Sequence, residues 1–228
     1  MKREIITTED GSTTIHLPEW DEQYHSKHGA IQEAYHVFIE MGFFCFLKNN
    51  NPNPLKILEI GFGTGLNTFI TLIEAEKNTT KVEYTGIEAY PIENFEIEKL
   101  NYPSELKTSE ELFNKLHLCP WEKNIEISKD FSLLKRKQFF SEIEDKDAFH
   151  IIYFDAFGAR VQPELWTVEI FQKMYNALKA GGVLVTYSAK GSVRRAMQEV
   201  GFTVERLPGP PGKREMLRAT KHSRHKVE

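Results

Sequence analysis

The chain has 228 residues, in which Asp and Glu outnumber Lys and Arg by 33 to 29 and give a formal net charge of −4. This length suits one α/β domain with added elements, and the charge argues against non-specific nucleic-acid binding over the whole surface, although a local basic patch is compatible with it. The N-terminus lacks the long apolar core of a signal peptide and no segment is apolar over a membrane-spanning length, so we expect a cytoplasmic protein that makes no membrane contact.

Residues 1–54 are expected to form an extension that precedes the main domain. Residues 4–7 and 13–16 flank the turn sequence Glu9-Asp10-Gly11, which predicts a β-hairpin. Residues 30–47 repeat apolar side chains along one side of a helix. The extension is therefore expected to consist of a hairpin and a helix.

The most informative segment, Ile57–Asn67, passes from an apolar strand pattern through Gly61, Gly63 and Gly65 into a helical pattern. Glycines let the backbone approach a ligand, and the helix N-terminus offers free N–H groups. A Walker loop would end in Gly-Lys-Ser/Thr and a dinucleotide site would have G-x-G-x-x-G spacing; neither is present. With Glu59 two residues before the first glycine, the pattern favours S-adenosylmethionine, whose sulfonium and amino group are positively charged, over a simple strand-to-helix turn.

Three later strand-like segments each end at an acidic residue. They are Val82–Ile87 with Glu88, Ile125–Asp130 with Asp130, and Ile151–Phe154 with Asp155. Ligands of open α/β sheets bind beyond the carboxyl ends of the strands, and an acidic residue 20–25 residues after the glycine turn is placed for ribose hydroxyls. We therefore expect Glu88 to bind a ribose and Asp130 to accept from an adenine amino group.

The alternation of strands and helices from residue 55 to residue 220 predicts a Rossmann-like α/β domain with a seven-stranded, mostly parallel sheet. The expected elements are a helical insertion at about 91–121, helices at 135–147, 163–180 and 191–200, strands at 183–187 and 201–206, an antiparallel strand at 213–220, and a disordered tail at 221–228.

The chain resembles the methyltransferase domain of MnmC-type tRNA modification enzymes over nearly its whole length. The matching segments are Glu59–Asn67, Asp155–Ala159 with Pro163–Trp166, Val193–Arg195, Gly201–Val204 and Gly212–Leu217. The resemblance implies a class I methyltransferase that uses S-adenosylmethionine to methylate the exocyclic amine of 5-aminomethyluridine, often 2-thiolated, at the tRNA wobble position. It implies the tRNA anticodon stem-loop as partner, a monomer, no metal, and, because the chain ends at Glu228, a stand-alone form without the FAD-dependent oxidase domain.

The expected site residues follow from the motifs and the resemblance together. Asp155 is expected to orient the acceptor amine and take its proton, or only to hold the cofactor. The expected cofactor-binding residues are Glu59, Gly61, Phe62, Gly63, Thr64, Gly65, Asn67, Glu88, Asp130 and Asp155. The expected substrate-binding residues are the aromatic Tyr24, Phe157 and Tyr187, which would stack on the uridine unless they belong to the core, and the basic Arg160, Lys190, Arg194, Lys213 and Arg214, which would contact phosphates.

Two other functions stay open. A methyltransferase or aminopropyltransferase acting on a small amine would share the fold and the glycine turn. A non-catalytic Rossmann-like module that binds tRNA or a protein would have no need for the acidic series, which speaks against it.

Overall fold

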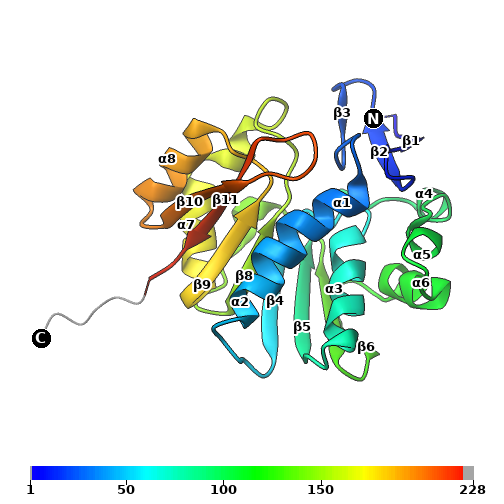
Figure 1. Cartoon of the computed structure of the whole chain (residues 1–228), viewed down its shortest axis with the longest axis horizontal. Helices are drawn as coiled ribbons and strands as arrows, with labels where there is room; N and C mark the ends of the chain where they lie inside the picture. Colours follow the sequence, from blue (N-terminus) through cyan, green and yellow to red (C-terminus); the bar gives the residue numbers. More distant parts are fainter. Residues whose placement is uncertain (1, 223–228) are drawn as a thin grey trace, which may run out of the picture.

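The computed structural model describes residues 2–222, which form one large sheet flanked by helices and one small sheet (Figure 1). The large sheet has eight strands in the order β10-β11-β9-β8-β4-β5-β7-β6. Its strands are β4 (Leu55–Ile60), β5 (Val82–Ile87), β6 (Asn124–Ser128), β7 (Phe131–Arg136), β8 (Phe149–Phe154), β9 (Leu178–Thr186), β10 (Thr203–Pro208) and β11 (Glu215–Thr220). The α/β class and the mostly parallel sheet are confirmed, with eight strands where seven were expected.

The five strands from β9 to β7 run parallel, so their carboxyl ends meet at one edge of the sheet. In the centre, Ile57 pairs with Tyr84 on one side and with Ile151 on the other. The central strands β4, β5 and β8 are each buried over their last four residues, as expected for parallel strands that are covered on both faces.

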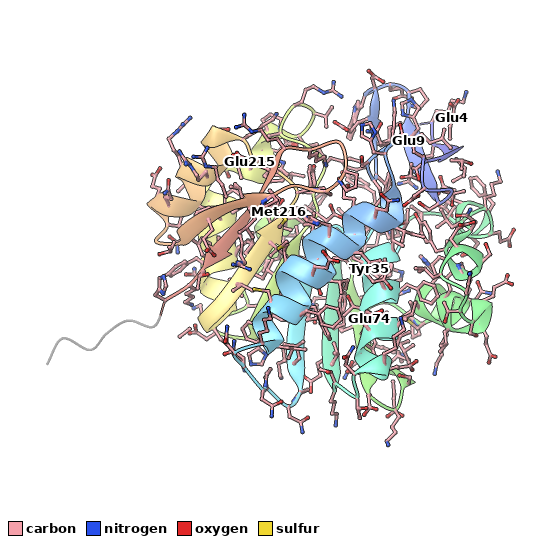
Figure 2. The ribbon with its side chains drawn as sticks, viewed as in Figure 1. Glu4, Glu9, Tyr35, Glu74, Glu215 and Met216 are labelled. Carbon is pink, nitrogen blue, oxygen red and sulfur yellow. The ribbon has the colours of Figure 1, made fainter. Side chains whose placement is uncertain are left out.

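One face of the sheet is covered by α3 (Leu66–Lys77) and by a long helix formed by α1 (Ala30–Ala34), η1 (Tyr35–Phe44) and α2 (Cys45–Leu47). The middle part, η1, has the hydrogen-bond pattern of a π-helix, and the three parts run on as one helix (Figure 1). The Tyr35 hydroxyl donates to Glu74 at 3.0 Å, and the two side chains lie between the helices in Figure 2. The helix expected at residues 30–47 is therefore confirmed and is attached to α3.

The other face is covered by α7 (Val168–Ala177) and α8 (Gly191–Glu199), preceded by the 3₁₀ turn η3 (Pro163–Trp166). Thr167 caps α7 by accepting from the Ile170 N–H. The expectation that the helix continues to residue 180 is wrong, because β9 already begins at Leu178. The chain turns at Gly181, whose φ is +79°.

The N-terminal hairpin is confirmed as β1 (Glu4–Thr7) and β2 (Thr13–Leu17), joined by the short β3 (Glu22–Gln23) into a small sheet. Two arginines attach this sheet to the main domain. Arg3 donates to Glu96 at 3.0 Å and to the Tyr90 carbonyl at 2.9 Å, and Arg160 donates to the Trp20 and Asp21 carbonyls at 2.9 and 2.7 Å. The small sheet therefore stays over the carboxyl ends of the parallel strands.

The helical insertion is confirmed as α4 (Asn94–Ile97), α5 (Tyr102–Glu105) and α6 (Glu110–Leu118). The helix expected at 135–147 is wrong: β7 runs to Arg136, and only the 3₁₀ turn η2 (Phe140–Glu142) follows. The end of β7 looks like a charged surface segment in the sequence because it contains Lys135. In the structure this side chain is buried, and its ammonium donates to the His117 carbonyl.

The tail at residues 221–228 is expected to be disordered. The backbone of Lys221 is hydrogen-bonded to β9, and residues 223–228 lie outside the described residues. The Lys221 N–H donates to the Gly182 carbonyl at 3.0 Å. Within residues 2–222, no helix has the length and apolar character needed to cross a membrane.

Candidate active site

A cleft of about 1850 Å³ lies between the carboxyl ends of the parallel strands and the small N-terminal sheet. Sites for a single small ligand measure about 300–1,000 Å³, so this cleft has room for two reactants. We call the part around Gly61–Asn67 and Glu88 the glycine half. The part around Tyr24, Glu33, Phe157, Tyr187 and Lys213 is called the aromatic half, and Asp155 lies between them.

The glycine turn is possible only without side chains. Gly61 has φ +90°, and a Cβ built on it would lie 2.6 Å from the Asp155 carbonyl oxygen. Gly63 has φ +49°, and its Cβ would lie 3.1 Å from the Tyr24 ring. Both values lie in the left-handed region that favours glycine. The backbone of the turn can therefore approach both the end of β8 and the Tyr24 ring.

The glycine half fits S-adenosylmethionine. The helix α3 begins at Leu66 with no side chain capping its N-terminus, and Leu66 and Asn67 line the cleft, so its free N–H groups suit a carboxylate. Glu88 follows β5 and accepts from the Gly63 N–H at 3.0 Å and from the Tyr90 N–H at 2.9 Å. Each Glu88 oxygen keeps a further lone pair for a ribose hydroxyl.

Asp155 follows β8 directly, and its backbone N–H is bonded to the Ile60 carbonyl at 2.9 Å. The Asn67 amide donates to its carboxylate at 2.8 Å, which orients the side chain toward the glycine half. The pKa of the Asp155 carboxyl is raised to about 7, mainly by burial and also by the nearby Glu33 carboxylate, while the bond from Asn67 and the Lys213 charge act in the opposite direction. The site thus holds a carboxylate that can accept a proton near neutral pH.

The three aromatic rings of the aromatic half come from segments that are far apart in the sequence. The Tyr24 and Phe157 rings meet edge to face with centroids 4.9 Å apart, and the Tyr187 hydroxyl donates to the Ala156 carbonyl at 2.8 Å. The Trp166 indole N–H donates to the Phe157 carbonyl at 2.8 Å and holds the loop after β8. The predicted aromatic residues Tyr24, Phe157 and Tyr187 therefore do line the cleft.

Lys213 points into the aromatic half. Its ammonium donates to Glu33 at 2.6 Å and lies 3.9 Å from the centre of the Tyr187 ring. The expected phosphate contact does not fit this position well, because the Lys213 ammonium is already paired with the buried Glu33 carboxylate. Arg160 and Lys190 do line the cleft, whereas Arg194 and Arg214 do not.

Three expected cofactor-binding residues, Asp130, Glu59 and Gly65, do not line the cleft. Asp130 is in the turn between β6 and β7, and its carbonyl accepts from the N–H of Val82, the first residue of β5. This is the amino-terminal edge of the sheet, so its expected place at the binding edge is wrong. The reason is that β6 runs antiparallel, and the parallel strand is β7.

Glu59 is fully buried beneath the turn and does not line the cleft, contrary to expectation. The Thr68 hydroxyl donates to it at 2.8 Å. Burial raises the pKa of Glu59 to about 8, although the bond from Thr68 opposes this. Gly65 also lies outside the cleft lining and instead serves as the N-cap of α3.

The sequence prediction missed Glu33, Tyr90 and Phe139, all of which line the cleft. Tyr90 and Phe139 are exposed aromatic residues whose rings are 6.0 Å apart, at the end of the glycine half. Tyr90 could have been found from its place two residues after Glu88, whereas Glu33 gave no local signal. Among the described residues, no group of three or more His, Cys, Asp or Glu side chains could hold a metal ion.

Comparisons with known proteins agree with this geometry. Residues 120–222 match a family model described as S-adenosyl-L-methionine-dependent methyltransferase. The tRNA 5-methylaminomethyl-2-thiouridine biosynthesis bifunctional protein MnmC of Leptospira interrogans is 32% identical over 230 residues, which cover 93% of this chain and 34% of that protein. Its counterpart in Leptospira borgpetersenii is 31% identical over 212 residues, which cover 87% and 32%. The chain corresponds to the methyltransferase part of these MnmC proteins.

Solved structures agree with this family. The crystal structure of MnmC2 from Aquifex aeolicus superimposes with a TM-score of 0.78 at 26% identity, covering 96% of this chain and 70% of that one. Spermidine synthase from Thermotoga maritima has a TM-score of 0.58 at 18% identity, covering 97% and 69%, which shows a shared fold alone. This MnmC-type chain spans about a third of the length of the curated relatives that it matches.

Proposed function

We propose that the protein transfers a methyl group from S-adenosylmethionine to the exocyclic amine of 5-aminomethyl(-2-thio)uridine at the wobble position of tRNA, in the cytoplasm. The observation that carries this proposal is the place of Asp155, between a glycine half that fits the methyl donor and an aromatic half that fits a base. The names of the MnmC relatives support the choice of acceptor.

When bound, S-adenosylmethionine supplies a methyl group on a positively charged sulfur. Asp155 accepts a proton from the substrate ammonium, which leaves a neutral nitrogen. That nitrogen then forms a bond to the methyl carbon as the methyl–sulfur bond breaks with its electron pair kept on sulfur, and the product leaves as a secondary ammonium. Holding the two reactants in line contributes up to ~7–11 kcal/mol to such reactions.

The uridine would lie in the aromatic half. Tyr24, Phe157 and Tyr187 offer ring faces and edges to a base that has left its stack, in the way single-stranded RNA is usually bound. Arg160 and Lys190 at the cleft would contact the phosphates on either side. The exposed side chain of Lys190 is the better placed of the two, because Arg160 already donates to three acceptors in the small sheet and its loop.

A small amine is the second candidate acceptor, and the carboxylates that line the cleft are compatible with it. Within the described residues, eight carboxylates and seven Lys or Arg side chains line the cleft. This near balance suits a short cation as well as an RNA. A polyamine would place its ammonium groups against the carboxylates, whereas tRNA would use the basic rim.

The test is methyl transfer from labelled S-adenosylmethionine to tRNA from cells that lack this gene, followed by mass spectrometry of the nucleosides. We expect a gain of one methyl group on 5-aminomethyluridine. Spermidine and putrescine are assayed in parallel under the same conditions. Transfer to these amines and none to tRNA would overturn the proposed acceptor and keep the donor.

A further inference from the structure

Glu33, Lys213 and Tyr187 form a charged cluster in the wall of the aromatic half. The Glu33 carboxylate is buried, accepting from the Lys213 ammonium at 2.6 Å and from the Ser26 N–H at 3.2 Å. The Lys213 ammonium also lies over the Tyr187 ring. The pair joins residues 180 positions apart, so it fixes the loop between β10 and β11 against α1.

This cluster is close enough to the reacting groups to act on their charge. The Tyr187 hydroxyl is bonded to the carbonyl of Ala156, the residue after Asp155. Glu33 raises the pKa of the Asp155 carboxyl and Lys213 lowers it, so both charges are felt at that carboxylate. An amine next to Asp155 would therefore lie within the field of both groups.

We propose that the Lys213 ammonium supplies the positive charge that keeps the acceptor amine neutral beside Asp155, and that Glu33 positions Lys213 for this purpose. The proposal rests on the proposed function. Two carboxylates alone would stabilise the substrate as an ammonium ion, which has no lone pair for attack. A fixed cation paired with Glu33 and felt at Asp155 offsets this effect, because like charges disfavour the charged form of the amine.

Other titratable groups also face Lys213. His25 is buried, and its pKa is lowered to about 4 by burial and by the Lys213 charge, so it is neutral above pH 5. His28 lies against Gly212 and pairs with Glu9 at 3.1 Å. Glu22 acts on Tyr187 from the small sheet and is itself paired with Arg160 at 3.3 Å. Because His28 lies against Gly212, the residue before Lys213, the experiment includes a control variant at His28.

The experiment is the pH dependence of kcat, from pH 5.5 to 9, for transfer to tRNA carrying 5-aminomethyluridine. Removing the cation in Lys213→Met keeps an apolar stem over Tyr187, and we expect the acidic limb to move up by about one pH unit. Removing the anion in Glu33→Gln is expected to move the same limb down by a similar amount. Lys213→Arg keeps the charge and is expected to leave the acidic limb in place, whatever its effect on the size of kcat. His28→Gln leaves the cluster intact and is expected to match the wild type.

Opposite shifts distinguish an electrostatic role from a structural one. If Glu33 and Lys213 only hold the loop, both variants will be slower and the limb will stay in place, which overturns the proposal. Should Lys213→Met fail to fold in a thermal melt, the downward shift in Glu33→Gln decides alone. If the wild type transfers no methyl group to this tRNA, the proposed function itself is wrong and this inference falls with it.

Discussion

The glycine half and the aromatic half of the cleft are made by the chain in different ways. The glycine half is one continuous segment, Gly61–Asn67, completed by Glu88 from the neighbouring strand, and its shape comes from backbone angles. The aromatic half gathers Tyr24, Glu33, Phe157, Tyr187 and Lys213 from five separate parts of the chain, and its shape comes from side chains. The comparison suggests that donor binding tolerates few backbone changes, whereas acceptor choice can be changed one side chain at a time.

The largest effect is expected at the boundary between the two halves. Asp155→Asn removes the proton acceptor and keeps the shape, so we expect kcat for methyl transfer to fall by about 10²–10⁴-fold. Binding of S-adenosylhomocysteine, measured by calorimetry, is expected to change by less than about threefold. Asp130→Asn is the matched control at the opposite edge of the sheet and is expected to alter neither value. Near-normal turnover in Asp155→Asn would show that this carboxylate only holds the donor.

Gly61→Ala tests whether the glycine half depends on its backbone. The added Cβ meets the Asp155 carbonyl oxygen, and the residue must keep a φ of +90°. A strained residue of this kind costs about 1–3 kcal/mol, so we expect S-adenosylhomocysteine to bind roughly 10–100-fold more weakly.

Gly181→Ala is the control for Gly61→Ala. Gly181 has a similar φ of +79°, but a Cβ there would meet nothing within 4 Å and would lie far from the cleft. We expect this variant to lose some stability in a thermal melt and to bind the ligand normally. Equal loss of binding in both variants would mean that strain alone, and not the approach of the turn to β8, decides the affinity.

Glu59→Gln tests whether the acidic residue buried beneath the glycine turn serves the fold. The folded protein keeps the Glu59 proton up to pH about 8, whereas the unfolded chain releases it near pH 4.5. The free energy of unfolding of the wild type therefore falls as the pH rises through this window. The neutral variant lacks this loss, so between pH 5 and pH 9 we expect its stability, read from the urea midpoint, to gain on that of the wild type by up to about 4 kcal/mol. A midpoint difference that is the same at pH 5 and pH 9 would contradict this role.

The smallest effect is expected at the rim of the aromatic half. Lys190→Ala removes one exposed cation at the cleft, so we expect tRNA affinity to fall about twofold to threefold and the salt dependence of binding to lose roughly one unit of slope. Lys129→Ala, at the opposite edge beside Asp130, is the control and is expected to bind tRNA like the wild type. A matching loss in both variants would indicate that the whole surface, not the cleft rim, attracts the tRNA.

The difference between the glycine half and the aromatic half also explains which parts of the site could be predicted from the sequence. The glycine turn, Glu88 and Asp155 were correctly placed, since each follows a buried strand within a few residues. Asp130 was misplaced because a charged turn between two antiparallel strands looks like the end of a single strand. The pair Glu33 and Lys213 was not predicted, because no local pattern reports an ion pair across 180 residues.

Tyr24 contacts residues of both halves of the cleft. Its ring lies against Gly63 on one side and meets Phe157 on the other. In an evolving lineage, a larger residue at position 63 would need a smaller one at position 24, and that exchange would also remove support from position 157. Unlike the rest of the aromatic half, these three positions are therefore expected to change together, because a variant that alters one of them alone loses packing at the others.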